Sequence, residues 1–82
     1  METTRKFTQD EISSALETLD TGVYGAVLRA KGIVPAADGS WIHFDFTPGE
    51  VNVRTGGADY TGRLCVIGSK LDEGKLTALF GL

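Results

Sequence analysis

The spacing of hydrophobic residues changes twice along this chain, and that order limits the folds available to it. From Ile12 to Leu19 the apolar residues recur at helical spacing, whereas from Ala26 to Gly68 they mostly alternate with polar ones. A second helical pattern follows Asp72. The order of helix, four strands and helix predicts an α+β fold: a small two-layer domain with a mainly antiparallel four-stranded sheet and two helices on one face.

Capping and turn residues set the expected element boundaries. Thr8 and Glu11 form an S/T-x-x-E capping box, in which each side chain accepts a hydrogen bond from the other residue's backbone N–H. We expect the fourth strand, which is apolar from Leu64 to Ile67, to be central. The expected elements are a helix over about Gln9 to Asp20; strands over Ala26–Pro35, Trp41–Thr47, Glu50–Arg54 and Arg63–Gly68; and a helix between its N-cap Asp72 and Gly81.

Length and composition describe one ordinary globular domain. The 82 residues are 41% hydrophobic and 23% charged, so residues 1–82 are expected to form one domain with one modest core. The net charge of -3 argues against a dedicated binder of nucleic acid or anionic membranes, whose surface is usually basic. Cys65 is the only cysteine, which excludes an internal disulfide and suits the reducing cytoplasm. No apolar run reaches the roughly 18 residues of a membrane span, and the polar start lacks the apolar segment of a secretory signal.

The expected strand Ala26–Pro35 carries two cations, Arg29 and Lys31, among apolar residues. Because successive side chains point to opposite faces of a sheet, both cations belong to the same face. We expect that face to be open, because the opposite set of side chains is small and apolar enough to lie under the helices. The helix-covered set is Leu28, Ala30, Gly32 and Val34, and the open set is Val27, Arg29, Lys31 and Ile33.

Strand pairing is expected to bring further polar residues to the open face. If Pro35 pairs with Trp41 across the turn, like residues share a face along both strands. This register sets Ile33 opposite His43 and Lys31 opposite Asp45. The same parity adds Asn52, Arg54, Arg63, Cys65 and Ile67.

The composition of the open face is typical of a docking surface, because interfaces are enriched in aromatic and Arg side chains. The candidate partner-docking residues are Arg29, Lys31, Trp41, His43, Asp45 and Arg63. The alternative is an ordinary solvated face. On such a face Trp41 packs along the aliphatic stems of Arg29 and Lys31, and Lys31 pairs with Asp45.

Two motifs resemble a known family. The run VLRAKGIVP, residues 27–35, resembles the Arg-Ala-Lys-Gly signature near the start of the C-terminal domain of CobW-type GTPases, and RLCVIGSKLDEGKL, residues 63–76, resembles the closing strand and helix of that domain. The resemblance covers the chain from about Phe7 to its end. It implies an N-terminal P-loop GTPase domain as partner, and a parent protein that uses GTP, magnesium and a transition metal in metal delivery or in cobalamin and metalloprotein assembly.

The chain departs from the full family pattern at the residues that perform the chemistry. It has no G-x-x-x-x-G-K-[ST], so it lacks a phosphate cradle, and it lacks the Cys-x-Cys-Cys metal motif of the GTPase domain. We therefore expect a non-catalytic accessory domain without a cofactor, either excised from a longer protein or an unusually short standalone copy. It is expected to dock on the GTPase domain or on a client metalloprotein through the open face.

The remaining chemical groups give weaker signals. His43 and Asp45 are two possible metal ligands without an evident third, so we expect no metal site. Cys65 is expected to be a packed small hydrophobic residue. The alternative function is a single-stranded RNA-binding module that stacks bases on Trp41 and binds phosphates through Arg29, Lys31 and Arg63, but the acidic composition favours the protein-docking hypothesis, with neither nucleic acid nor membrane as a partner.

Overall fold

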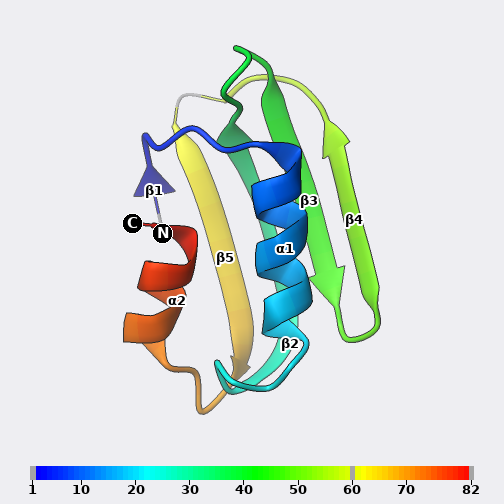
Figure 1. The fold of residues 1–82 in the computed structure, drawn as a ribbon, viewed down its shortest axis with the longest axis vertical. Helices are drawn as coiled ribbons and strands as arrows, with labels where there is room; N and C mark the ends of the chain where they lie inside the picture. The colour runs from blue at the N-terminus through cyan, green and yellow to red at the C-terminus, as the bar shows by residue number, and fades with distance from the viewer. Residues whose placement is uncertain (1, 60, 82) are drawn as a thin grey trace.

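The computed structural model describes residues 2–59 and 61–81 and shows an α+β domain of two layers, as predicted. Both helices lie on one face of an antiparallel sheet, with α1 over the β3–β4 side and α2 beside β5 (Figure 1). The sheet order is β1-β5-β2-β3-β4, so the central strand is β2 and not β5, the strand predicted from the sequence to be central. The elements are β1 (Glu2–Thr3), α1 (Gln9–Leu19), β2 (Ala26–Pro35), β3 (Trp41–Thr47), β4 (Glu50–Thr55), β5 (Gly62–Ser69) and α2 (Glu73–Phe80).

The sheet has five described strands rather than the four predicted. The additional strand, β1, is two residues long and pairs with β5, placing Glu2 opposite Arg63 and Thr3 opposite Gly62. Two residues are too few to show an alternating pattern, which explains why the sequence does not reveal this strand. As a result β5 is an inner strand beside the central β2, although its outer neighbour covers only one of its ends.

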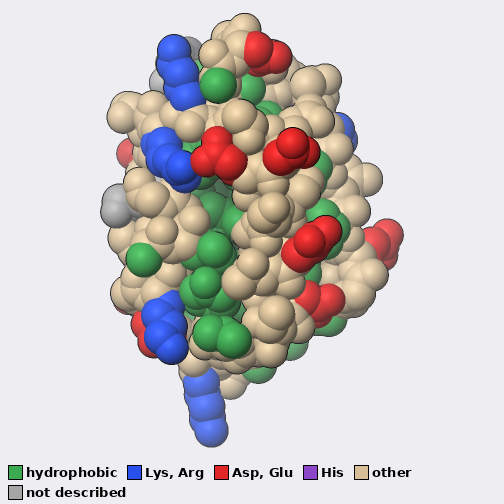
Figure 2. Space-filling model, in the orientation of Figure 1, with side chains coloured by type: hydrophobic (Ala, Val, Ile, Leu, Met, Phe, Trp, Pro, Cys, Tyr) green, Lys and Arg blue, Asp and Glu red, His purple; other side chains and the backbone are tan. Residues whose placement is uncertain are grey.

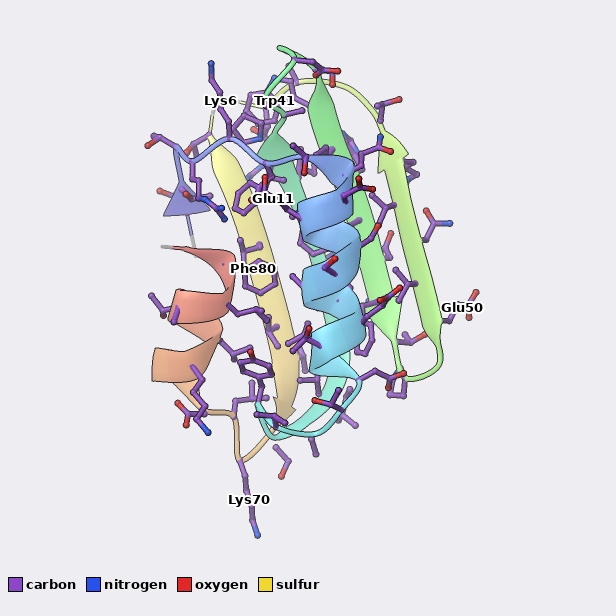
Figure 3. The ribbon with its side chains drawn as sticks, in the orientation of Figure 1. Lys6, Glu11, Trp41, Glu50, Lys70 and Phe80 are labelled. Atoms are coloured by element: carbon purple, nitrogen blue, oxygen red, sulfur yellow. The ribbon has the colours of Figure 1, made fainter. Side chains whose placement is uncertain are left out.

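The core lies between the helices and the sheet. Residues from α1 and from the inner side of β3 are fully buried, and Phe80 points from α2 toward the space between the two helices (Figure 3). Its ring stacks against Phe44 of β3, with centroids 6.4 Å apart and an interplanar angle of 16°. This aromatic pair ties α2 to the sheet. The largest fully buried side chains are Phe7, Phe44, Phe46, Phe80, Ile12, Leu16, Leu19, Ile42 and Val34.

A β-bulge near the start of β2 corrects one part of the predicted alternation. The pairing of β2 with β5 shifts register between Val27 and Arg29, so Leu28 is an extra residue. Val27 takes the core position, with 6% of its surface exposed, whereas Leu28 is 61% exposed. The prediction that Leu28 lies under the helices and Val27 on the open face is therefore wrong, because the two residues have exchanged these environments. From Ala30 onward the alternation is as predicted, with Ala30 and Val34 in the core.

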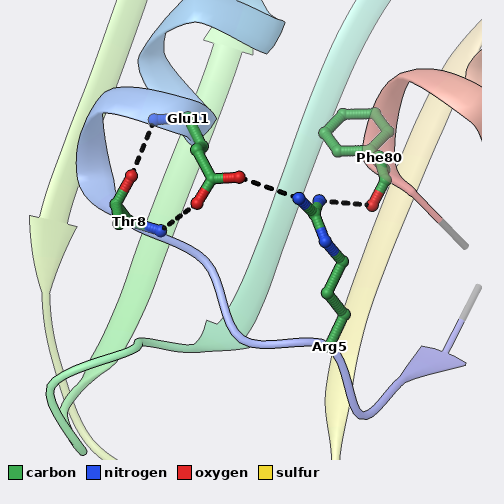
Figure 4. A network of polar contacts seen from close by, with 4 residues as sticks. All are labelled: Arg5, Thr8, Glu11 and Phe80. Carbon is green, nitrogen blue, oxygen red and sulfur yellow. Dashed lines mark hydrogen bonds and ion pairs between the residues drawn. The ribbon is translucent and has the colours of Figure 1, made fainter.

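A cluster of polar contacts fastens the N-terminal segment to both helices (Figure 4). The Arg5 guanidinium donates to the carbonyl of Phe80 at 2.9 Å and to the Glu11 carboxylate at 2.8 Å, and it lies 4.4 Å from the centroid of the Phe7 ring. Glu11 also accepts from the backbone N–H of Thr8, whose hydroxyl accepts from the N–H of Glu11. The predicted capping box is therefore present, and Arg5 links it to the C-terminal end of α2.

These contacts make Glu11 a source of pH-dependent stability. The Thr8 backbone hydrogen bond, followed by the charge of Arg5, holds the pKa of the Glu11 carboxyl below its usual range, partly opposed by desolvation. A carboxyl whose pKa is lower in the folded state stabilises the fold above its unfolded pKa of about 4.3, and this contribution disappears as the pH falls through the folded pKa.

We expect Glu11→Gln to unfold at lower denaturant concentration than the parent chain at pH 7. The difference should narrow steadily below about pH 4.3, because protonation then removes the same charge from the parent. Denaturant titrations from pH 3 to 7 would measure it. Glu17→Gln, an exposed change on the same helix, is the matched control, and an equally pH-dependent difference there would contradict the assignment to Glu11.

Candidate functional site

The face of the sheet opposite the helices carries the predicted candidate residues in regular rows. The β2–β3 register is as predicted, with Lys31 opposite Asp45 and Pro35 opposite Trp41. One row across four strands consists of Arg63, Ile33, His43 and Arg54. The next row consists of Cys65, Lys31, Asp45 and Asn52, and beyond it Ile67 lies opposite Arg29. We call this surface the open face.

The centre of the open face is a shallow depression of about 700 Å³. Five of the six candidate docking residues line it, and Trp41 is the exception. Its charged lining consists of the cations Arg29, Lys31, Arg54 and Arg63 and the carboxylates Glu2 and Asp45. Of these, Glu2 could not be assigned from sequence because it lies on the unpredicted β1.

Asp45 organises the cations on the β3–β4 side of the depression. Its carboxylate lies 3.1 Å from an Arg54 nitrogen and 3.8 Å from an Arg29 nitrogen. Arg54 also donates to the Asn52 side chain at 2.9 Å. Within the described residues, Lys31 has no ion pair, so the predicted pair with Asp45 is a register neighbour and not a salt bridge. All three charged groups of the Asp45 cluster are about half exposed, so these pairs contribute little to stability.

Arg63 is anchored differently, at the β5 side of the depression. Its guanidinium forms a hydrogen-bonded ion pair with Asp59, whose side chain is largely buried, in the segment before β5. Glu2 is its register neighbour on β1. Arg63 therefore borders the depression as an ion-paired cation, whereas Lys31, which also lines it, is an exposed side chain.

Trp41 does not lie beside Lys31 or Arg29. It pairs with Pro35 at one end of β3, and Lys31 lies opposite Asp45, four residues away, which is about 13 Å along an extended strand. Arg29 is farther still in the same direction. The alternative in which Trp41 packs along the stems of Arg29 and Lys31 is therefore wrong. The same spacing separates the stacking residue of the RNA hypothesis from Arg29 and Lys31. The third cation of that hypothesis, Arg63, lies opposite Ile33, two residues along β2 from Pro35.

His43 is held by a contact within the chain. Its Nε2 atom lies 2.8 Å from the carbonyl oxygen of Gly57 and therefore donates a hydrogen bond to it. Gly56 lies against the ring, where an added Cβ would approach the ring atoms to 2.5 Å. With Nε2 protonated and engaged, only Nδ1 of His43 could bind a metal.

The described residues contain no group of three or more His, Cys, Asp or Glu side chains placed to hold a metal ion. Asp45 is engaged by two arginines, and His43 by a backbone carbonyl. The residues present therefore do not fit the transition metal implied for the parent protein, and the absence of a P-loop from the sequence removes the site for GTP and magnesium.

Cys65 corrects another expectation. It is exposed, on the open face opposite Lys31, and not packed in the core. The apolar run from Leu64 to Ile67 suggested burial on both faces, but helices cover only one face, so Leu64 is buried while Ile67 is 52% exposed. The bulge brings Leu28 to the same end of the open face. The alternation of the sequence could not predict that Leu28 is exposed, because nothing in the pattern marks Leu28 as the extra residue of a bulge.

Comparison with known proteins agrees with this architecture. The family model described as the cobalamin synthesis protein cobW C-terminal domain matches residues 1–81. The chain belongs to this family. The crystal structure of the Zn(II)-bound YjiA GTPase from E. coli shares the fold, with a TM-score of 0.76 and 22% sequence identity.

The extent of that structural match places the fold within a longer chain. The match covers 99% of the present chain but 27% of the YjiA chain, so a CobW C-terminal domain such as this one corresponds to about a quarter of that GTPase. No curated protein sequence matches the chain significantly. In the part of the chain that the structure describes, neither helix has the length and apolar character needed to cross a bilayer.

Proposed function

We propose that this CobW C-terminal domain is a non-catalytic accessory domain that docks on a P-loop GTPase domain or on a client protein through the open face. The observation that carries the proposal is a sheet with one face under two helices and the other uncovered, in a domain that belongs to the cobW C-terminal domain family and shares its fold with about a quarter of a GTPase. The uncovered face presents a cation-lined depression with exposed aliphatic side chains at one end.

The aliphatic end of the open face supports docking rather than simple solvation. Leu28 and Ile67 expose 61% and 52% of their surfaces, and they lie beside Arg29. Protein interfaces commonly join apolar contacts with Arg side chains that are desolvated on binding. The bulge places Val27 in the core and leaves Leu28 exposed at the same end as Ile67, so these two aliphatic side chains offer apolar surface that a docked partner would cover.

In this proposal, the reactions of the parent protein take place in its other domain. GTP hydrolysis, magnesium and the transferred metal are assigned to a P-loop domain, and the present domain contributes recognition during cytoplasmic metal delivery or metalloprotein assembly. The structural likeness to a GTPase whose crystals contain Zn(II) is consistent with a role beside a metal-handling domain.

The test is titration of the isotope-labelled chain with the P-loop domain of a CobW-type GTPase from the same organism, followed by amide NMR. Shifts confined to the open-face strands, and at least threefold weaker binding by Leu28→Ser/Ile67→Ser, are expected. Val51→Ser is the matched control, because Val51 is an exposed aliphatic residue on the helix-covered side of β4. Shifts confined to α1 and α2, or equal weakening by the control, would reject docking through the open face.

A further inference from the structure

Charge is distributed unequally between the two faces of the domain. The depression in the open face is lined by four cations and two carboxylates, a net charge of +2 that falls to +1 when Asp59, the ion-pair partner of Arg63, is counted, although the whole chain carries -3. The remainder of the molecule is correspondingly acidic. On the helix-covered face, acidic side chains gather on the α1 side (Figure 2), and the first turn of α1 alone contributes Asp10 and Glu11.

We propose that the open face recognises a carboxylate-rich protein segment, and that Asp45 occupies the site of one partner carboxylate when no partner is bound. This inference rests on the proposed docking function and specifies the chemistry of the partner. A positive patch on an otherwise negative protein favours an acidic partner surface and disfavours other surfaces of the same sign.

The arrangement of the cations fits several carboxylates rather than one ion. Arg63 on β5 and Arg54 on β4 end the same row, three strands apart, so their backbones are separated by about 14 Å. Lys31 lies between them in the adjacent row, and Arg29 extends the positive surface toward the exposed aliphatic end. A segment that crosses the strands can therefore place successive acidic side chains against separate cations and an apolar side chain against Leu28 and Ile67.

Asp45 is the internal competitor in this arrangement. It is the one carboxylate on β3, and both of its arginine partners are about half exposed. Arg29 approaches it only to 3.8 Å, a loose ion pair that an incoming carboxylate can replace with a hydrogen-bonded one. Removing the Asp45 charge leaves Arg29 without this ion pair and Arg54 with only its hydrogen bond to Asn52, and it raises the positive charge of the depression.

A protein segment fits this surface better than RNA. Single-stranded RNA binding usually combines cations with exposed aromatic rings on which bases stack. The aromatic residue that lines the depression is Phe44, which is buried, and Trp41 lies outside it. The exposed side chains next to the cations are instead aliphatic, as in protein interfaces.

The test uses poly-L-glutamate of about 20 residues as the acidic probe and oligouridine of matched length as the phosphate probe, each titrated into the intact chain at low and at physiological salt. We expect poly-L-glutamate to shift amides of β2, β3, β4 and β5, with weaker binding as salt rises. Because this double change removes two exposed contacts between cations and carboxylates, Arg29→Gln/Lys31→Gln should weaken binding about threefold to tenfold. Asp45→Asn should tighten it, by about twofold to fivefold on the same basis.

The matched control is Lys6→Gln/Lys75→Gln, which changes the net charge by the same amount at exposed positions outside the depression. If this control loses as much affinity as Arg29→Gln/Lys31→Gln, the proposed recognition by the open face is rejected, and the binding depends only on the net charge of the protein. Unchanged or weaker binding by Asp45→Asn would overturn the competitor role. If oligouridine binds more tightly than poly-L-glutamate, and Trp41→Ala abolishes that binding, the acidic-segment inference is rejected in favour of RNA binding.

The same variants separate this inference from the docking proposal. If the P-loop domain binds the open face and Leu28→Ser/Ile67→Ser weakens that binding, docking is supported. If, in that complex, neither salt nor the charge variants change the affinity, the acidic-segment inference is rejected while docking stands. Weaker binding with Arg29→Gln/Lys31→Gln and tighter binding with Asp45→Asn support both.

Discussion

Phe44→Ala is expected to destabilise the domain by about 3 to 5 kcal/mol, the usual cost of truncating a buried aromatic residue. Phe44 is 1% exposed, lies opposite Gly32 in the β2–β3 ladder and stacks on Phe80. Its removal therefore opens a cavity between the sheet and α2. Since small domains are stable by only about 5 to 15 kcal/mol, this single change should remove a large part of the total. Urea unfolding followed by circular dichroism would measure the loss.

A double-mutant cycle with Phe80→Ala tests whether the aromatic pair itself couples α2 to the sheet. The two single changes should not add, and the coupling is expected to be about 0.5 to 1.5 kcal/mol, the range for aromatic pairs beyond their area burial. If either single variant is too unstable, Phe44→Leu and Phe80→Leu provide a milder cycle. Strict additivity in both cycles would show that the stacked geometry contributes nothing beyond apolar burial.

The sequence predicted the elements that carry strong local signals. The capping box at Thr8 and Glu11 locates the start of α1, and Gly81, with a φ of 66°, ends α2 in the left-handed conformation that glycine adopts most easily. Alternation along Trp41–Thr47 gave the β3 faces and, with Pro35 opposite Trp41, the β2–β3 register. These features are predictable because each depends on residues close together in the chain.

The features that the sequence did not predict depend on contacts between distant segments. Strand β1 exists because Glu2 and Thr3 meet β5, and the bulge at Leu28 exists because β2 must pair with β5 on one side. Strand parity placed Cys65 on the open face correctly, whereas the expectation that it is packed is wrong, because both described helices lie on the other face (Figure 1). For the candidate site, the predicted β2–β3 register is confirmed, and the same register already implies that Trp41 lies four residues along the strand from Lys31.

The Arg-Ala-Lys-Gly run that identified the family divides between two tasks in the structure. Arg29 and Lys31 point to the open face, whereas Ala30 is buried and Gly32 faces Phe44 on the helix-covered side. A Cβ on Gly32 would lie 2.6 Å from two atoms of the Phe44 ring and 2.7 Å from the backbone carbonyl oxygen of Arg63. The glycine is therefore required by the core, and its contribution is independent of any partner.

Gly32→Ala is expected to destabilise the domain by about 1 to 3 kcal/mol, the usual cost of overpacking, despite the better backbone propensity of alanine in a strand. Gly57→Ala is the matched control and should change stability by less than about 0.5 kcal/mol, because nothing lies within 4 Å of its added Cβ. Repeating Gly32→Ala in a Phe44→Leu background removes part of the ring that blocks the Cβ but keeps the Arg63 carbonyl. If Gly32→Ala costs less stability in that background, the Phe44 ring is the reason that this position requires glycine. If the cost is unchanged, the reason is the close approach of the β5 backbone.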